Sequence, residues 1–302
     1  MTDADHTARS PDLHVELIAV LTALGETAPM VMTLGAADRL PSGPFAQEHR
    51  SLQTGLRRWV EHLTGHRLGY IEQLYTFADR DRQAADAAGR AISISYLGLM
   101  RAEIADQPHT RWCDWYAYFP WEDHRNGEPP VIAADIAPRL RAWAGDDAAA
   151  WARAAGLFGL DGQGWNEELV LQRYELLYAA GLVAESGSTA PVPGQPMFAD
   201  HRRILATAMA RLRTKIKYRP VVFELMPPVF TLLHLQRAVE ALSGRSIHKQ
   251  NFRRLIEQQE LVEDTGEVDS GTGGRPAKLF RFRSAVQTER TYLGTRPPVS
   301  RA

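Results

Sequence analysis

The chain has 302 residues, 44% of them hydrophobic and 24% charged, with a formal net charge of −1, so it fits one large or two ordinary domains and its total charge indicates no particular partner. A single cysteine, Cys113, excludes an intrachain disulfide and a zinc site built from cysteines. The acidic, polar amino terminus does not resemble a secretory signal and no apolar run is long enough to span a bilayer, so we expect a cytoplasmic protein without a membrane segment.

The first two thirds of the chain predict strands mixed with helices. Residues 13–24 form a mostly apolar run that fits a buried strand, with a helix as the alternative, and residues 40–45 indicate a loop. An amphipathic helix is expected over residues 47–63, ending near Gly65, because apolar residues recur there at spacings of four and three: Leu52, Leu56, Val60 and Leu63. Further strands are expected at 70–77, 91–98 and, rich in aromatic residues, 112–121, and further helices at 133–145 and 166–184. This order predicts an α/β or α+β fold.

A change in composition and charge divides the chain near residue 200. Residues 186–196 are dominated by proline, glycine and small polar residues, which is typical of a linker or loop, and a basic helix over residues 200–217 follows. From residue 201 onward the chain has 19 lysines and arginines against 9 acidic residues, a net charge of +10, whereas residues 1–200 have 16 against 27, a net charge of −11. Such asymmetry favours a partner with phosphate groups, with an ordinary solvated basic face as the alternative.

Two helices separated by a tight turn are expected in the last domain, which begins near residue 224. Thr231 fits the N-cap of the first helix, and Gly244 fits its end. Ser246 fits the N-cap of the second helix. The buried side is expected from Leu232, Leu235, Val239 and Leu242 in the first helix and from Phe252, Leu255 and Ile256 in the second.

The second of these helices carries a cationic, amide-rich face, and a glycine-rich hairpin follows it at residues 271–283. A helix followed by a basic hairpin is typical of a winged helix-turn-helix. Arginine can donate two hydrogen bonds to guanine, glutamine or asparagine can pair with adenine, and basic side chains on the hairpin can contact phosphates. We expect contacts to double-stranded DNA from Ser246, Lys249, Gln250, Asn251, Arg253 and Arg254 in the helix and from Arg275 and Lys278 in the hairpin. A winged domain used only for protein contact is the alternative.

Several segments together resemble the Nudix-related transcriptional regulators of NAD metabolism, of the NadQ and NrtR type. The similarity extends from about residue 13 to residue 283 and is carried by residues 40–45, 55–60, 72–77, 92–98 and 218–282. The resemblance implies an α+β fold in which a Nudix-like α/β/α sandwich domain is followed by a winged helix-turn-helix domain. It also implies a repressor of NAD biosynthesis or related metabolism, with a Nudix-like domain that senses a nucleotide-type effector such as an NAD-related metabolite, ADP-ribose or ATP.

The resemblance can be checked against the metal site of an active Nudix hydrolase, which binds Mg²⁺ through a glutamate pair three and two residues before a glycine. With Gly65 as that glycine, Arg58 fits the family pattern, but the metal-binding pair falls on His62 and Leu63. Mg²⁺ requires hard oxygen ligands, and leucine has none. Glu61 is nearby but lies about 100° round the helix from His62. We therefore expect no bound metal, no required cofactor and no enzymatic activity.

Arginines on or beside this helix remain candidates for binding an anionic effector. Arg50, Arg57 and Arg58 gather there, and arginine is a good bidentate partner for phosphate. The alternative is that each is a solvated surface charge.

These observations predict a sensor domain joined to a DNA-binding domain. The expected boundaries are a disordered amino terminus at 1–12, a Nudix-like sensing domain at 13–195, a basic linker helix at 196–222, a winged helix-turn-helix domain at 223–284 and a flexible tail at 285–302. A homodimer is expected because one helix in one groove reads too few base pairs for specific repression. Two other functions remain open: a divergent Nudix hydrolase of a nucleoside diphosphate derivative with an accessory basic domain, and an adaptor that uses both domains for protein contact.

Overall fold

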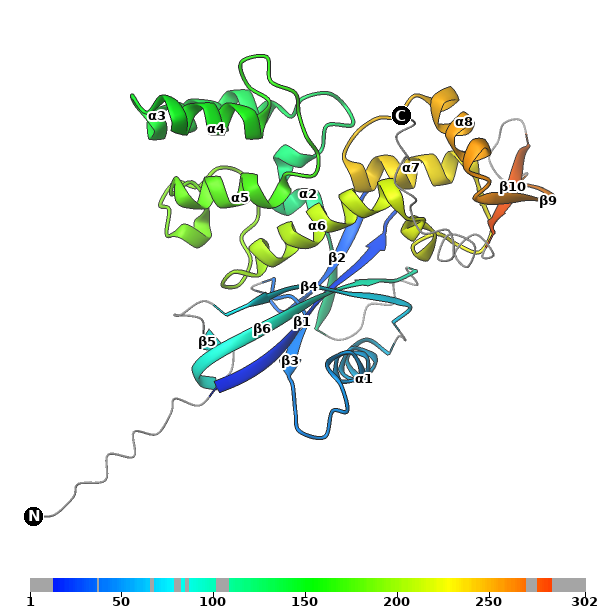
Figure 1. Cartoon of the computed structure of the whole chain (residues 1–302), viewed down its shortest axis with the longest axis horizontal. Coiled ribbons are helices and arrows are strands. Elements are labelled where there is room, and N and C mark those ends of the chain that lie inside the picture. Colours follow the sequence, from blue (N-terminus) through cyan, green and yellow to red (C-terminus); the bar gives the residue numbers. More distant parts are fainter. Residues whose placement is uncertain are drawn as a thin grey trace, which may run out of the picture.

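The computed structural model describes residues 13–36, 38–65, 68–78, 83–84, 87–101, 109–269 and 276–283. Within them, a seven-stranded sheet forms the centre of one domain and a three-stranded sheet lies in a second, smaller domain. Figure 1 shows helix α1 (Leu52–Thr64) on one side of the large sheet and helix α6 (His201–Tyr218) on the other, with further helices beyond α6. The fold is α+β: an α/β/α sandwich followed by a winged helix domain, as the sequence predicts.

The large sheet is mixed, with parallel and antiparallel neighbours. Its strands are β1 Leu13–Leu24, β2 Pro29–Leu34, β3 Ser42–Pro44, β4 Tyr70–Phe77, β5 Gln83–Ala84, β6 Ala87–Leu99 and β7 Thr110–Asp114. Their order is β4-β6-β1-β2-β7, with β3 paired to β1 and β5 paired to β6. The central strands β1 and β6 run parallel, and β1 and β2 form an antiparallel pair.

Side chains of β1 alternate between two cores, because successive residues of a strand point to opposite faces of the sheet. Leu17 and Leu21 pack with Leu56 of α1. Ile18 and Val20 point the other way, into the larger core that includes α6. Both faces of β1 are therefore buried, which explains why its sequence is apolar along most of its length.

The segment between the large sheet and the winged domain is helical. Its helices are α2 Trp115–Tyr118, α3 Ala137–Ala144, α4 Ala148–Phe158, α5 Val170–Ala179 and α6 His201–Tyr218. A 3₁₀ turn, Pro120–Glu122, follows α2, and a π-helical turn, Ile132–Ile136, leads into α3. Within the described ranges, no helix is both long and apolar enough to cross a membrane.

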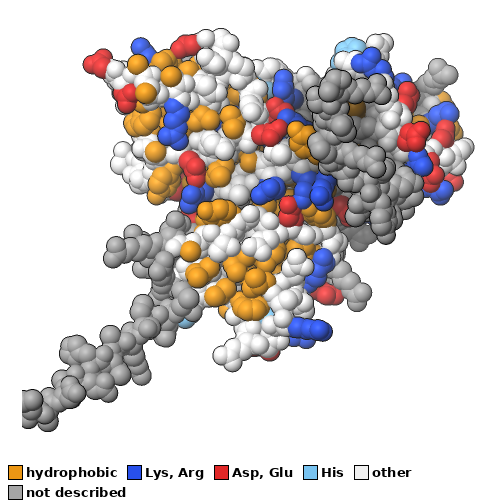
Figure 2. All heavy atoms as spheres, in the orientation of Figure 1, with side chains coloured by type: hydrophobic (Ala, Val, Ile, Leu, Met, Phe, Trp, Pro, Cys, Tyr) orange, Lys and Arg blue, Asp and Glu red, His pale blue; other side chains and the backbone are white. Residues whose placement is uncertain are grey.

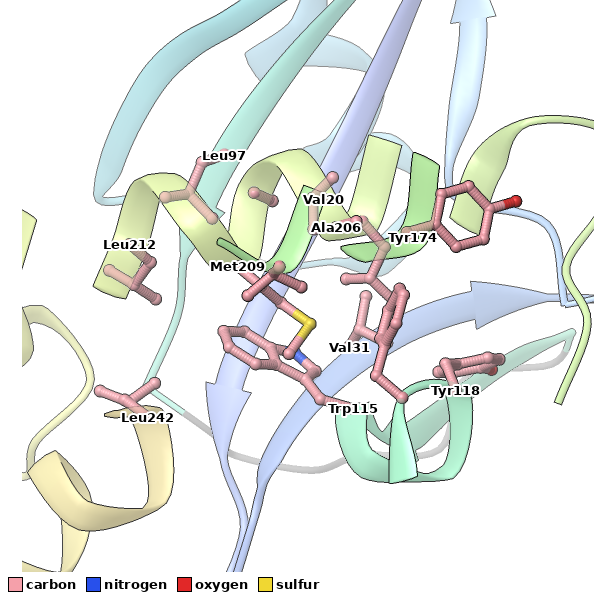
Figure 3. Close-up of a cluster of buried hydrophobic side chains, with 14 of the residues drawn as sticks. Val20, Val31, Leu97, Trp115, Tyr118, Tyr174, Ala206, Met209, Leu212 and Leu242 are labelled. Carbon is pink, nitrogen blue, oxygen red and sulfur yellow. The ribbon is translucent and has the colours of Figure 1, made fainter. Parts of the chain in front are cut away.

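Helix α6 packs against the large sheet, α2 and the winged domain. Met209 and Leu212 on α6 have no exposed surface. Figure 3 shows them in one cluster with Val20 from the sheet, Trp115 from α2 and Leu242 from helix α7 (Leu232–Ser243). The helix expected as a basic linker is thus present, and its apolar side is buried against three other parts of the molecule.

The winged domain has the expected order of elements: β8 Phe230–Thr231, α7 Leu232–Ser243, α8 Lys249–Gln259, β9 Val262–Asp269 and β10 Ala277–Phe282. The strands pair in the order β8-β10-β9. Thr231 caps α7, since its side chain accepts a hydrogen bond of 3.1 Å from the backbone N–H of His234. Gly244 ends α7 in the left-handed region, with φ of +70°. Both capping predictions are confirmed.

The structure differs from the sequence prediction at several elements. The strand expected over residues 112–121 ends at Asp114, because the Asp114 side chain accepts a 2.8 Å hydrogen bond from the Tyr116 N–H and starts α2. The loop expected at 40–45 contains the short strand β3, and the helix expected at 166–184 is confined to α5. Helix α4 was not expected at all.

After the 3₁₀ turn Ala184–Ser186, residues 187–196 form a loop that is packed against the helical segment. Val192 is buried, and its N–H donates to the Leu182 carbonyl at 2.8 Å. The Gln195 N–H donates to the Ala117 carbonyl at the same distance. This loop therefore belongs to the body of the domain. The expected disordered amino terminus at 1–12 and the tail at 285–302 lie outside the described residues.

Candidate nucleic-acid interface and sensor region

Helix α8 is the expected recognition helix, and it begins two residues later than the sequence suggests. Its N-cap is His248, in an extended conformation and without a side-chain capping bond. The prediction that Ser246 is the N-cap is therefore wrong. Phe252 and Ile256 are buried against the domain, which fixes the orientation of the helix.

The cationic face of α8 points away from this core. Lys249, Gln250, Arg253 and Arg254 are exposed, and at about 100° per residue Gln250 and Arg254 lie nearly opposite the buried side. The structure thus brings four of the expected DNA-contacting residues onto one accessible surface. Leu255, expected in the core, is 47% exposed, because only one narrow side of α8 contacts the domain.

Two of the expected helix residues, Ser246 and Asn251, lie elsewhere. Both line a groove of about 460 Å³ that runs beside α8, away from Arg253. The groove has an apolar floor that includes Leu235 and Val239 of α7. It is also lined by Lys217, Arg219, Arg245 and His248, together with the carboxylate of Glu167. None of these four basic residues was among the candidates predicted from the sequence, although Lys217 and Arg219 stand in the basic segment after residue 200.

The wing is formed by β9 and β10. On it, the Lys278 ammonium pairs with Asp264 at 2.7 Å, and this pair holds the pKa of Asp264 below its usual value. Arg281 pairs with Glu263 in the same way. Lys278 is exposed and reaches solvent, but part of its charge is neutralised locally. Arg275 lies outside the described residues.

A buried charge network joins the winged domain to the helical segment. Glu122 has no exposed surface and accepts hydrogen bonds from Arg173 at 2.6 and 2.9 Å and from Arg213 at 2.6 Å. Burial alone raises the pKa of Glu122, but the two guanidinium groups outweigh it and the pKa lies below its usual range. Arg213 also donates to the Leu242 carbonyl at 3.1 Å, and the His124 N–H donates to the Gly244 carbonyl at 2.8 Å. The end of α7 is therefore hydrogen-bonded to α6 and to the segment that follows α2.

The arginines expected to bind an effector lie on or next to α1. The Arg57 guanidinium donates to the backbone carbonyls of Leu68 and, at 3.1 Å, Gly69, so it closes the loop that follows the helix. Arg50 and Arg58 are exposed. In the described part of the chain, no group of three histidine, cysteine or acidic side chains is placed to hold a metal ion.

Comparison with known proteins agrees with this architecture. Residues 222–282 match the family model of the NrtR DNA-binding winged helix domain. Over 83 residues the chain is 41% identical to the ADPR-responsive transcriptional repressor NtrR of Acinetobacter baylyi. That match covers 28% of this chain and 33% of the relative, so it spans about a third of the relative's length.

Solved structures extend the similarity of fold to most of the chain. NrtR of Shewanella oneidensis, solved in complex with DNA, has a TM-score of 0.54 at 22% identity, covering 91% of this chain and 95% of that one. A MutT/nudix family protein of Enterococcus faecalis has a TM-score of 0.55 at 20% identity, covering 90% and 89%. The chain therefore shares its overall fold with these two proteins, and its last domain matches the NrtR winged helix family.

Proposed function

We propose that this protein is a ligand-responsive transcriptional repressor that binds double-stranded DNA through its winged helix domain. The observation that carries the proposal is the exposed face of α8, with Lys249, Gln250, Arg253 and Arg254, in a domain that matches the NrtR winged helix model. Recognition helices contact base edges mainly with residues near their N-termini. We place the DNA-binding domain at residues 223–284 and expect the protein to act in the cytoplasm.

We further propose that the Nudix-like domain binds a nucleotide-type effector without hydrolysing it. The relative from Acinetobacter baylyi is described as responsive to ADP-ribose, which makes this compound the first effector to test. Arg50 and Arg58 are exposed next to α1 and are available to a phosphate, whereas Arg57 must first leave its two carbonyl partners. NAD-related metabolites and ATP are the other effectors to test, and the regulated genes are expected to serve NAD metabolism.

The test is a set of binding isotherms on an operator selected from a random DNA library and on DNA of mixed sequence. Arg253→Ala should weaken the free energy of binding to the operator by about 1–3 kcal/mol and that to mixed DNA much less, because a bidentate base contact exists only on the right sequence. Glu257→Ala, at another exposed position on α8, is the matched control and should not weaken binding. An operator affinity that Arg253→Ala leaves unchanged contradicts this placement of α8 in the groove.

The same protein distinguishes a sensor from a hydrolase. ADP-ribose should change operator affinity and raise the melting temperature, since a ligand that binds only the folded state stabilises it. It should be recovered intact after incubation with Mg²⁺, because His62 and Leu63 provide no acidic pair for the metal. Turnover that Glu61→Gln abolishes would instead identify a divergent Nudix hydrolase.

A further inference from the structure

Three basic residues outside the recognition helix line the groove beside it: Lys217, Arg219 and Arg245, here called the cationic shelf. Lys217 and Arg219 stand at the carboxyl end of α6, and Arg245 stands in the turn between α7 and α8. The Arg245 side chain is 54% exposed and that of Lys217 is 39% exposed. Two elements far apart in the sequence thus place positive charge on one accessible edge of the DNA-binding domain.

The helical segment supplies two carboxylates to this shelf. Glu167 contacts Arg245 Nη1 at 3.0 Å and Lys217 Nζ at 2.7 Å. Its neighbour Glu168 contacts Lys217 Nζ at 2.6 Å and accepts a 2.8 Å hydrogen bond from the Thr214 hydroxyl. One acidic pair therefore bridges the last turn of α6 and the turn of the helix-turn-helix.

The position of the shelf relative to α8 indicates what it meets. Arg245 is four residues before Lys249, the first residue of α8. Lys249 is exposed, and so are Ser246 and His248 in the turn before it. In a helix-turn-helix on DNA, the N-terminal end of the recognition helix enters the major groove and the element before it crosses the phosphate backbone. Tyr218, next to the shelf, is 75% exposed and can donate its hydroxyl to a phosphate. The chemistry of this edge fits a phosphodiester backbone.

We propose that the cationic shelf is a second DNA-contacting surface, which binds the phosphate backbone beside the DNA major groove that α8 reads. In the absence of DNA, Glu167 and Glu168 occupy this surface. This inference rests on the proposed DNA-binding function. The two carboxylates stand where phosphates go, so DNA must displace them, and they lower the affinity for DNA of any sequence. Base contacts made by α8 remain necessary for specific binding.

The exposure of the shelf supports an exchangeable contact over a purely structural one. The pair between Arg202 and Glu185 shows the structural type: their side chains are 1% and 4% exposed. Arg245 and Lys217 instead reach solvent, and ion pairs with exposed members typically contribute only about 0–1 kcal/mol to stability. The Glu167 side chain is itself only 10% exposed, so Glu168, at 29%, is the carboxylate that phosphates replace at the lower cost to the fold.

The experiment measures binding to a labelled duplex of mixed sequence at several salt concentrations. Each phosphate contact adds about 0.9 to the slope of log affinity against log salt. Arg245→Ala should lower this slope by about that amount. Glu167→Gln and Glu168→Gln should both tighten binding, most strongly at low salt. In the double variant Glu167→Gln with Arg245→Ala, part of the gain should disappear, because one of the two cations that Glu167 holds is missing.

The matched control is Glu175→Gln, which removes the same charge from another surface pair. Glu175 contacts Arg203 at 2.8 Å and is 37% exposed, but Arg203 lies about 22 Å along α6 from Tyr218, at about 1.5 Å per residue. The affinity of the Glu175→Gln variant for DNA should equal that of the wild type. Circular dichroism and melting temperatures identify any variant that fails to fold, and the variants at the partly exposed Glu168 and the exposed Arg245 keep the test decisive if Glu167→Gln is unstable.

Two outcomes separate failure of the shelf from failure of the function. If DNA binding depends on Arg253 but neither Arg245→Ala nor the glutamate variants change affinity or salt slope, the shelf does not contact DNA. If Glu175→Gln tightens binding as much as Glu167→Gln, the effect is one of net charge and the shelf is again refuted. If the wild type binds neither the selected operator nor mixed DNA, the proposed function itself is wrong, and the shelf with it.

Discussion

At the scale of single residues, three arginines are buried in ion pairs, a structural role that is unusual for this residue type. Arg173, Arg202 and Arg213 are at most 1% exposed, although arginine is almost never fully buried unless it is paired. Arg173 and Arg213 share Glu122, and Arg202 pairs with Glu185. Because these partners are 17 to 91 residues apart in sequence, no local pattern identifies them. The sequence showed a basic helix, and only the structure shows that two of its arginines face inward.

Removal of the Glu122 charge should strongly destabilise the fold. Glu122→Gln leaves Arg173 and Arg213 buried without their shared carboxylate, and loss of one partner from a buried pair typically costs about 3–5 kcal/mol. Because the pKa of Glu122 is lowered in the folded state, its contribution is present above the unfolded value of about 4.3 and is lost as pH falls through the folded value. Urea unfolding at neutral pH, repeated at decreasing pH, should show the difference between wild type and variant closing on the acid side.

The control for this measurement is Glu175→Gln, in which an exposed pair with Arg203 is broken. Its effect should stay below about 1 kcal/mol. Equal losses in the two variants would mean that the Glu122 network contributes no more than a surface pair.

At the scale of elements, prediction from sequence worked where periodicity or capping residues were clear. Strands β1, β4 and β6 were expected close to their observed positions, and α1 ends where expected but begins at Leu52, after the Ser51 N-cap, and not at residue 47. Helix α4 was missed because its alanine-rich sequence has no apolar stripe, although the Asp147 side chain caps it and Gly159 ends it in the left-handed region. Leu255 was misplaced because periodicity gives the direction of a side chain and not the width of the surface that covers it.

The end of α7 should tolerate no side chain at Gly244. Its φ is +70°, and a Cβ there would lie 2.4 Å from the Glu122 carbonyl oxygen and 2.7 Å from Arg213 Nη2. Gly181 has nearly the same φ, +69°, with no atom within 4 Å of the added Cβ. Gly181→Ala should therefore lower the free energy of unfolding only by the cost of a left-handed backbone at a residue with a Cβ, about 1–2 kcal/mol. Gly244→Ala should lower it distinctly more. Thermal unfolding compares the two, and equal shifts would show that the contact with the Glu122 network relaxes freely.

At the scale of the whole molecule, the described basic residues after residue 200 include a group paired with acids of the first 200 residues and a group exposed on the winged domain. Part of the positive excess after residue 200 is matched inside the protein by acids from the first 200 residues, through pairs such as Arg203 with Glu175, Lys215 with Glu72 and Lys217 with Glu167. Among the described side chains on the face seen in Figure 2, basic and acidic groups lie next to each other. These pairs thus join the two halves of the chain, and the exposed face of α8 and the partly neutralised cationic shelf form the proposed DNA-binding side.

The last prediction concerns assembly. A single α8 of 11 residues spans only a few base pairs, so we expect a two-fold symmetric dimer whose recognition helices enter successive major grooves, about 34–36 Å apart or a multiple of that distance. Sedimentation at micromolar concentration should give a dimer, and a selected operator should be palindromic. Insertion of half a helical turn between the half-sites should weaken binding far more than insertion of a full turn, because half a turn places the second site on the opposite side of the duplex. A protein that stays monomeric on the palindromic operator, and that is indifferent to the spacing, reads DNA with one helix alone.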